Sequence, residues 1–159
     1  SAQASFEILA RKELGQMPEF FEVKRYKVTV ERRKNKYDRM VSLSEAVVVV
    51  KVDGDKKLSV SESMDDHGCD RGPVNALAKA LAKDLGRYQG QIDDMRLVDF
   101  KVRITQGGTE AATRVIIDSE DGQGRRWSTV GVSPNIVDAS FEALLDAINW
   151  KLLHGQGAA

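Results

Sequence analysis

The stretch from Arg126 to Leu152 constrains the fold most, because it contains signals for a strand, a turn and a helix in direct succession. Residues 127–132, Trp-Ser-Thr-Val-Gly-Val, are rich in aromatic and β-branched side chains, which suit a half-buried strand. Ser133 can cap a following helix, and Pro134 suits its first position, where an N–H would have no partner. The helix then carries apolar residues on one face: Val137, Phe141, Leu144, Ile148 and Leu152. This face predicts that the helix packs on a sheet.

Six strands are predicted, three in each half of the chain: Phe20–Arg33, Leu43–Val52, residues around Leu58 and Val60, then Leu97–Thr105, Ala111–Ser119 and Trp127–Val132. The run Ala-Val-Val-Val-Val within Leu43–Val52 is typical of a central strand that is buried on both sides. Hairpin turns are expected at 53–55 and 121–124, which are rich in Asp and Gly. A helix is expected after Pro73, ending at Gly86.

Two β-β-β-α units therefore follow one another, about 60 residues apart. The predicted fold class is α+β, with two antiparallel sheets packed with helices, related by a pseudo-twofold and preceded by a short helix that ends at Gly15. We assign residues 1–19 to this leading helix and a linker. Residues 20–159 then form one domain, whose halves span about 20–90 and 91–153.

Composition narrows the class of protein. The 24 basic and 24 acidic residues among 159 give a net charge of zero, so no basic excess indicates nucleic acid or an anionic membrane as a partner. The single cysteine cannot form an internal disulfide, and the chain has neither a signal peptide nor a long apolar run, so we expect a cytoplasmic protein. The chain begins Ser-Ala-Gln without Met, and we expect it to be part of a longer protein.

The loop from Asp65 to Arg71 contains carboxylates, an imidazole and a thiol, all of which can bind metals. Its spacing matches no zinc signature, and the only other histidine is His154, so we predict a solvated loop without a metal. Ser133 has no histidine placed to act as its base. No set of acid, base and nucleophile is recognisable, which argues against an enzyme in this chain alone.

The two helix starts, at Pro73 and Pro134, suggest an anion site, because the first N–H groups of a helix are unpaired and carry positive dipole. Val74, Phe100, Ile104 and Ile136 could add an apolar pocket, while Asp70 and Asn75 could accept hydrogen bonds from an ammonium group. Together these features describe a site for an apolar amino acid. The alternative is that the same residues are only core and caps, and the pattern alone does not decide between the two.

Several motifs, taken in order, closely resemble the C-terminal regulatory domain shared by 2-isopropylmalate synthases and citramalate synthases. They are Gly72-Pro73-Val74-Asn75-Ala76, Leu97-Val98-Asp99-Phe100-Lys101-Val102-Arg103-Ile104, Gly108-Thr109, Thr113-Arg114-Val115 and Trp127-Ser128-Thr129-Val130-Gly131-Val132-Ser133 with the helix that follows. The start, Ala4-Ser5-Phe6-Glu7-Ile8-Leu9-Ala10-Arg11-Lys12, resembles the citramalate synthase branch in particular. The resemblance covers nearly the whole chain.

The resemblance implies an allosteric domain that forms a homodimer and binds a branched-chain amino acid, which mediates feedback inhibition. Isoleucine is favoured, as in citramalate synthases of isoleucine biosynthesis, and leucine, as in 2-isopropylmalate synthases, is the alternative. It also implies that this fragment has no catalytic residues and no cofactor. The catalytic part, a metal-dependent acyltransferase joining acetyl-CoA to a 2-oxo acid, would lie upstream and hold a divalent metal.

Carried over by motif, the effector site would use eleven residues: Asp70, Gly72, Val74, Asn75, Leu97, Phe100, Ile104, Thr109, Ala111, Pro134 and Ile136. The chain departs from the family pattern in two places. Phe100 stands where tyrosine is common, and Asp70-Arg71 replaces a smaller turn. Strict alternation would also put Leu97 on the strand face opposite Phe100 and Ile104, so a bulge must redirect it if all three meet one ligand.

Two further classes of function share parts of this pattern. The order helix, three strands, helix is also that of a double-stranded RNA-binding domain, but the start of the second helix is Gly-Pro-Val-Asn-Ala rather than a basic cluster. A dimerisation module without a ligand would have the same fold, and only a ligand test separates it from a sensor. We therefore expect an amino acid effector, a second copy of the chain and its own catalytic domain as partners, with no nucleic acid and no membrane.

Overall fold

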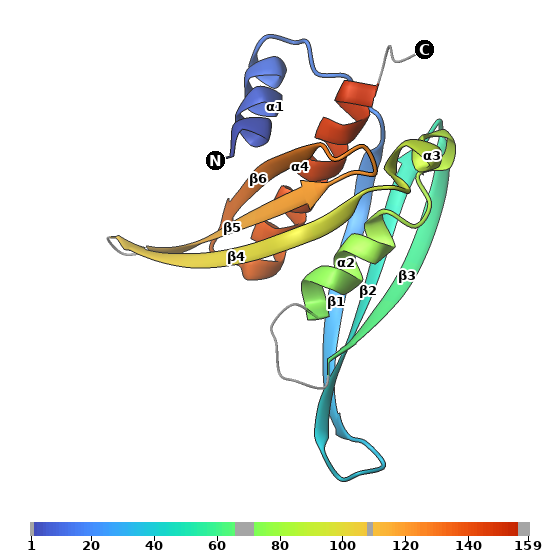
Figure 1. Ribbon diagram of the computed structural model, residues 1–159, viewed down its shortest axis with the longest axis vertical. Helices are drawn as coiled ribbons and strands as arrows, with labels where there is room; N and C mark the ends of the chain where they lie inside the picture. The colour runs from blue at the N-terminus through green and yellow to red at the C-terminus, as the bar shows by residue number, and fades with distance from the viewer. Residues whose placement is uncertain (1, 66–71, 108–109, 156–159) are drawn as a thin grey trace. The chain divides into compact units, whose positions relative to one another are not determined.

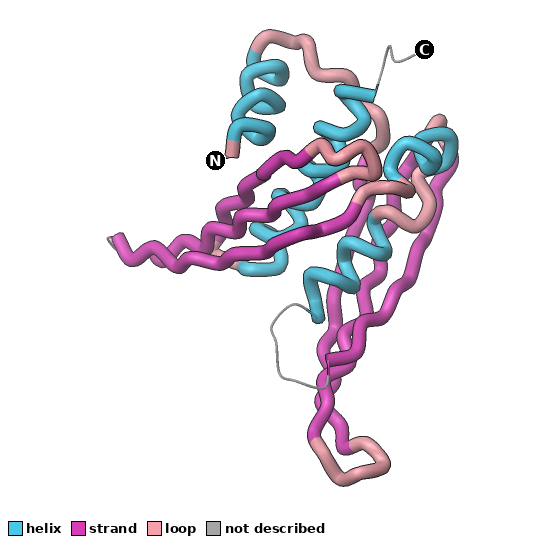
Figure 2. The backbone as a smooth tube through the Cα atoms, viewed as in Figure 1, coloured by secondary structure: helices cyan, strands magenta, loops and turns pink. Residues whose placement is uncertain are grey.

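In the computed structural model, which describes residues 2–65, 72–107 and 110–155, the chain forms two compact units (Figure 1). One comprises residues 21–89, and the other joins residues 1–20 to residues 90–159. The elements are α1 (Gln3–Glu13), β1 (Glu22–Lys34), β2 (Met40–Val52), β3 (Asp55–Asp65), α2 (Gly72–Leu81), η1 (Gly86–Tyr88), α3 (Gln89–Ile92), β4 (Arg96–Gly107), β5 (Glu110–Glu120), β6 (Arg126–Ser133) and α4 (Ile136–Gly155). Each unit has one antiparallel three-stranded sheet, so the predicted α+β class is confirmed (Figure 2).

In the unit of residues 21–89 the strand order is β1-β2-β3. The valine-rich run lies in the central strand β2, as predicted, and residues 46–50 are all buried. The β2–β3 turn needs two left-handed residues, Asp53 (φ 52°) and Gly54 (φ 85°), which suits a two-residue hairpin loop. Helix α2 packs on one face of the sheet, where Gly72 approaches Ser44 closely.

In the other unit the strand order is β4-β5-β6, and α4 packs on β5 and β6. Two strand side chains donate hydrogen bonds to helix carbonyls: Trp127 Nε1 to Ala147 O at 3.0 Å and Thr129 Oγ1 to Ala143 O at 2.8 Å. Next along the same face lies the buried Gly131, where a Cβ would come within 1.9 Å of a helix carbonyl oxygen. The strand and the helix therefore approach too closely for any side chain at this position.

The leading helix α1 belongs to this second unit and lies beside β6 and α4. The backbone N–H of Val130 donates to the Ser5 hydroxyl at 2.9 Å. Since β6 is an edge strand, this contact covers part of an edge that could otherwise pair with another chain. The helix ends before Gly15, whose φ of 67° is left-handed, as expected for a helix stop.

The predicted helix from Pro73 to Gly86 is wrong at its C-terminal end, because α2 stops at Leu81. The next residues form turns and the short η1 and α3 helices, which were not predicted. The side chain of Gln89 stabilises this path: it accepts from Leu85 N at 2.8 Å and donates to Ala82 O at 2.6 Å. These bonds pair two backbone groups that a continuing helix would have paired itself.

Candidate functional site: an apolar row on β4 and the start of α4

Strand β4 carries an apolar row on the face of the sheet that α4 covers elsewhere. Phe100 is opposite Ile117, Val102 is opposite Val115, and Ile104 is opposite Thr113. Their partners on β5 are buried under α4, but β4 lies at the edge of the sheet, so its row is less covered. Val102 is 37% exposed and Ile104 is 67% exposed. Ile104 is therefore not a core residue of its unit.

A β-bulge brings Leu97 onto the same face, as the predicted site requires. The register shifts between Leu97 and Asp99, so Leu97 is opposite Ser119, while Asp99 is opposite Asp118. Ser119 is buried and lies two residues from Ile117, hence on the same side of β5. The bulge thus resolves the conflict in the alternation. Strand β1 has a comparable shift near its start, between Val23 and Arg25.

The start of α4 lies at the same end of the sheet as Ile104, because Ile104, Thr113 and Ser133 are in register across the three strands. The predicted cap is wrong here: α4 begins at Ile136, and neither Ser133 nor Pro134 belongs to it. Asn135 provides the cap instead. Its Oδ1 accepts from the N–H groups of Val137 at 2.8 Å and Asp138 at 3.3 Å.

This cap changes the chemistry expected at the helix start. Two of the first N–H groups of α4 already have a side-chain acceptor, so they are not free to bind a ligand carboxylate. The start of α4 presents two apolar side chains to solvent, Pro134 and the 46% exposed Ile136, beside the polar Asn135 and Asp138. In this unit the predicted site residues therefore form a surface suited to an aliphatic side chain. Ala111, at the start of β5, is opposite Gln106 on β4.

The other predicted site residues belong to the unit of residues 21–89 and surround the start of α2. Gly72 and Val74 are buried, and Asn75 is partly exposed on the first turn. A Cβ at position 72 would come within 3.0 Å of the Ser44 hydroxyl, so a small residue lets the helix start lie directly on β2.

Some predictions fall on residues outside the described part of the chain, namely Asp70, Thr109 and most of the loop considered for a metal. The ends of that loop are assigned differently from the prediction, because Asp65 closes β3 opposite Ser42 and Gly72 opens α2. Among the His, Cys, Asp and Glu side chains that the structure describes, no group of three is placed to hold a metal ion.

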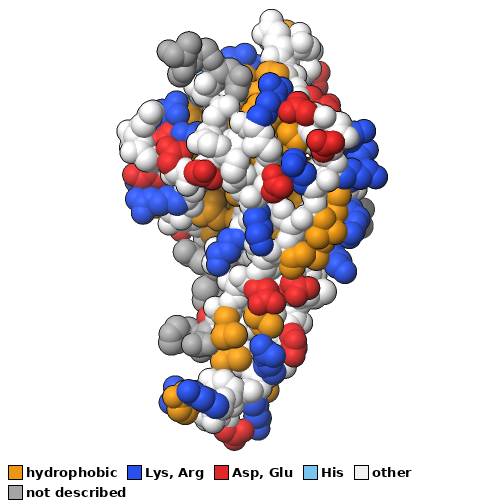
Figure 3. All heavy atoms as spheres, turned by 90° about the vertical axis from the view of Figure 1, so that its right-hand side faces the viewer, with side chains coloured by type: hydrophobic (Ala, Val, Ile, Leu, Met, Phe, Trp, Pro, Cys, Tyr) orange, Lys and Arg blue, Asp and Glu red, His pale blue; other side chains and the backbone are white. Residues whose placement is uncertain are grey.

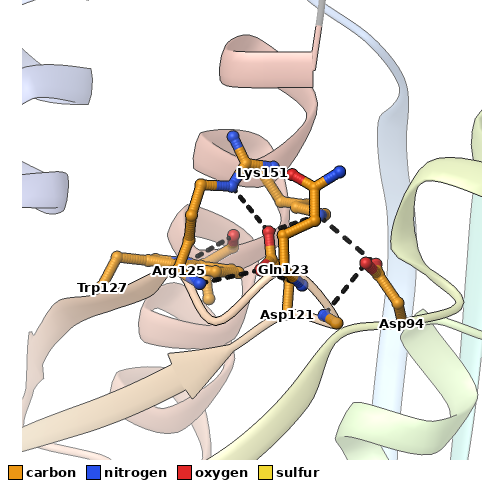
Figure 4. Close-up of polar contacts among 8 residues, drawn as sticks. Asp94, Asp121, Gln123, Arg125, Trp127 and Lys151 are labelled. Atoms are coloured by element: carbon orange, nitrogen blue, oxygen red, sulfur yellow. Dashed lines mark hydrogen bonds and ion pairs between the residues drawn. The ribbon is translucent and has the colours of Figure 1, made fainter.

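A buried ionic cluster, which sequence reasoning missed, holds the β5–β6 turn to α4 (Figure 4). Asp121 is 4% exposed and accepts from Lys151 Nζ at 2.7 Å and from Arg125 Nε at 2.7 Å. Lys151 also lies 3.3 Å from Asp94, which accepts from Gly122 N at 3.0 Å. Burial alone would raise the pKa of Asp121, but the Lys151 and Arg125 hydrogen bonds outweigh it and hold this pKa well below its usual range. These bonds join the β5–β6 turn to Lys151 of α4 and to Asp94, so the cluster has a structural role.

The same unit contains a cavity of about 390 Å³ between α1, β6 and the second half of α4. Its lining includes Glu7, Asp118, Arg126, Trp127 and Trp150, none of which belongs to the predicted site. The two tryptophan rings stack at 4.8 Å. Burial of Glu7 would raise its pKa, but hydrogen bonds from a histidine and an arginine side chain outweigh this effect and lower it. Glu7 thus fastens α1 to α4 through His154, while Asp118 accepts a hydrogen bond from Ser128 and Arg126 lies 3.6 Å from Glu120.

Comparison with known proteins identifies the class to which these two units belong. The chain is a member of the LeuA allosteric (dimerisation) domain family, which it matches over residues 1–152. It is 42% identical over 153 residues to the (R)-citramalate synthase of Geobacter sulfurreducens, and 37% identical over 155 residues to that of Aquifex aeolicus. These matches cover 95% and 96% of this chain but only 27% of each relative.

A 2-isopropylmalate synthase of Methanocaldococcus jannaschii is 38% identical over 78 residues, which is 49% of this chain and 14% of that protein. The chain is thus an allosteric (dimerisation) domain of the citramalate synthase family and is more distantly related to 2-isopropylmalate synthases. It spans about a quarter of the length of its citramalate synthase relatives. In the described part of the chain, every helix is too short or too polar to cross a membrane.

Proposed function

We propose that this domain binds a branched-chain amino acid, with isoleucine favoured over leucine, and thereby mediates feedback inhibition of a citramalate synthase of which it forms part. The observation that carries the proposal is the apolar row of Phe100, Val102 and Ile104 on β4, in which Ile104 is 67% exposed, together with Ile136, which is 46% exposed at the start of α4. The whole protein would be an acyltransferase that joins acetyl-CoA to a 2-oxo acid with a divalent metal. That activity would lie in the part of the protein outside this chain.

The chemistry of this apolar row supports an aliphatic ligand. Leu97, Phe100, Val102 and Ile104 lie on one face of β4, and a branched hydrocarbon side chain placed on them would lose apolar contact with water. Burying such a side chain contributes about 1.5–3 kcal/mol. Because Asn135 already caps α4, we do not assign the ligand carboxylate to the start of this helix.

An apolar surface of this kind distinguishes isoleucine from leucine only weakly, since moving or removing one methylene changes the free energy of binding by only about 1–3 kcal/mol. The preference for isoleucine therefore rests on the relationship to citramalate synthases, which extends over 95% of the chain. The 38% identity over 78 residues to a 2-isopropylmalate synthase keeps leucine as the second candidate.

Thermal unfolding in the presence of isoleucine, leucine, valine and alanine tests this proposal. A ligand at one hundred times its Kd stabilises the folded state by about 2.7 kcal/mol, so isoleucine should raise the Tm clearly. Ile104→Thr should abolish the shift while leaving the Tm without ligand nearly unchanged, because Ile104 is 67% exposed. Leu9→Thr, at a residue of α1 that is 57% exposed, is the matched control and should keep the shift.

The outcomes distinguish the two functions that the family name combines. A rise in Tm with leucine alone would indicate the leucine-sensing domain of a 2-isopropylmalate synthase instead. If none of the four amino acids changes the Tm, the domain is a dimerisation module without an amino acid ligand. A shift that survives Ile104→Thr unchanged would place the ligand elsewhere than on β4.

A further inference from the structure

The basic and acidic side chains on the face of the molecule that Figure 3 shows are interspersed, so this face has no extended patch of one charge. A more specific combination of charged and aromatic groups lines the cavity of about 390 Å³ between α1, β6 and the second half of α4. Small-molecule sites usually have volumes of about 300–1,000 Å³. The cavity is therefore large enough for one small organic ligand.

One wall of this cavity is aromatic. The rings of Trp127 and Trp150 stack with their centroids 4.8 Å apart. Both rings are held in place, because Trp127 Nε1 donates to Ala147 O at 3.0 Å and the Trp150 ring packs on the His154 ring at 4.3 Å. His154 is in turn hydrogen-bonded to Glu7 at 2.9 Å. Since aromatic rings attract one another in offset and tilted arrangements, this wall favours an aromatic group in the ligand.

The cavity also contains a carboxylate without a basic partner. Asp118 on β5 accepts a hydrogen bond from the Ser128 hydroxyl. None of the ion pairs between described residues includes Asp118, and Lys101, on the same face of the sheet, pairs with Asp99 at 3.7 Å. A carboxylate has two oxygens that accept several hydrogen bonds. Asp118 can therefore receive an ammonium group as well as the Ser128 hydroxyl.

Arg126 on β6 supplies a positive charge beside Asp118. Its register partner is Glu120, but one oxygen of this carboxylate is shared between Arg126 Nε at 3.6 Å and Arg96 at 3.0 Å. Two guanidinium groups thus face one carboxylate, and no hydrogen bond or ion pair between described residues engages the terminal NH₂ groups of Arg126.

The register of β5 and β6 also sets the spacing of the two charges. Asp118 is opposite Ser128, two residues from Arg126, so Asp118 and Arg126 are diagonal neighbours on one face of the sheet. Diagonal neighbours lie about 7–8 Å apart. The ammonium and carboxylate groups of one amino acid can span this distance with a hydrogen bond at each end.

We propose that this cavity binds a zwitterionic α-amino acid with an aromatic side chain. The ammonium group pairs with Asp118, the carboxylate binds the guanidinium of Arg126, and the aromatic side chain lies against the two tryptophan rings. An arginine fork suits a carboxylate because it can donate two parallel hydrogen bonds. Because Ala4 also lines the cavity, the bound amino acid lies against α1 as well. The site shares no residue with the apolar row on β4, so the inference goes beyond the proposed function and does not depend on it.

Tryptophan fluorescence with phenylalanine as the probe tests this inference, because the chain contains two tryptophans and both line the cavity. Phenylalanine is not excited in the tryptophan band, so a saturable change reports on Trp127 or Trp150. Phenethylamine, which lacks the carboxylate, and hydrocinnamate, which lacks the ammonium group, should each bind at least about 10-fold more weakly than phenylalanine. These two analogues test the charges of the site without any substitution.

Two substitutions test the residues themselves. Asp118→Asn and Arg126→Gln should each raise the Kd for phenylalanine by about 10-fold or more, since each removes one charge-assisted contact. Arg103→Gln is the matched control and should keep the wild-type Kd, because Arg103 is exposed on β4 and does not line the cavity. Circular dichroism checks that each variant is folded, and the analogues decide the outcome if a variant is not.

The inference is overturned if phenylalanine, up to its solubility limit, causes no saturable change in fluorescence, or if the two analogues bind as tightly as phenylalanine. A Kd that is unchanged in both folded variants would overturn it as well. A failure of the proposed function is distinct, because Ile104→Thr should abolish the Tm rise with isoleucine and leave phenylalanine binding unchanged. Saturable phenylalanine binding without any Tm change from isoleucine would overturn the proposed function and leave this inference intact.

Discussion

Replacing Asp121 by asparagine tests whether the buried ionic cluster holds the second unit together. Asparagine keeps the acceptor that Oδ1 offers to the N–H groups of Gln123 and Arg125, each at 3.0 Å. It replaces Oδ2, however, by an NH₂ group that faces Lys151 Nζ and Arg125 Nε. The Lys151 and Arg125 donors then point at a third donor, the new NH₂ group. Among the described residues, Lys151, which is 5% exposed, keeps only Asp94 as an ion-pair partner.

Removing one partner of a buried ion pair costs about 3–5 kcal/mol, and since Asp94 remains we expect about 3 kcal/mol of lost unfolding free energy. For a chain of this size that corresponds to a Tm lower by about 6–12 °C. Urea unfolding and calorimetry measure both quantities. Asp38→Asn is the control, because Asp38 pairs with Lys34 on an exposed turn and should cost no more than about 1 kcal/mol.

The difference in unfolding free energy between wild type and Asp121→Asn should also depend on pH. The pKa of Asp121 is lowered in the folded state, so its contribution is present above the unfolded-state pKa of about 3.9 and is lost as the pH falls below that value. The difference between wild type and Asp121→Asn should therefore shrink from pH 7 toward pH 3. A difference below 1 kcal/mol at pH 7, or one that grows at low pH, would refute this account.

Three other substitutions test contacts in the same unit. Gly131→Ala would place a Cβ within 1.9 Å of the Ala139 carbonyl oxygen and should cost at least about 2–3 kcal/mol in urea unfolding, as overpacking against backbone does. Thr129→Val removes a fully buried donor to Ala143 O and should cost about 1–3 kcal/mol by the same measurement. Glu7→Gln weakens the attachment of α1 and should speed its proteolysis at pH 7; because the folded-state pKa of Glu7 is lowered, the effect should fade below about pH 4.5.

The strands could be predicted from the sequence because their alternation is local. The buried strand β2 and the turn at Asp53-Gly54 follow from β-branched side chains and from residues that tolerate positive φ. The end of α2 could not be predicted in this way, because Gln89, eight residues beyond Leu81, supplies the hydrogen bonds that redirect the chain.

For similar reasons, some parts of the candidate site could be predicted from the sequence and others could not. Periodicity placed Phe100 and Ile104 together, but the bulge that adds Leu97 depends on pairing with β5, which strand alternation does not contain. Ser133 and Asn135 are both good capping residues, and the local path of the chain selects Asn135. The pairing of Asp121 with Lys151 joins residues thirty positions apart, for which the sequence contains no local signal.

The most direct test of amino acid binding is an NMR titration of the domain with isoleucine, observing the methyl groups of the protein's own isoleucine residues. The account predicts that the signals of Ile104 and Ile136 shift together and saturate, while those of the buried Ile8 and Ile117 change little. Signals of Ile104 and Ile136 that remain unchanged at saturating isoleucine would contradict the claim that β4 and the start of α4 form the effector site.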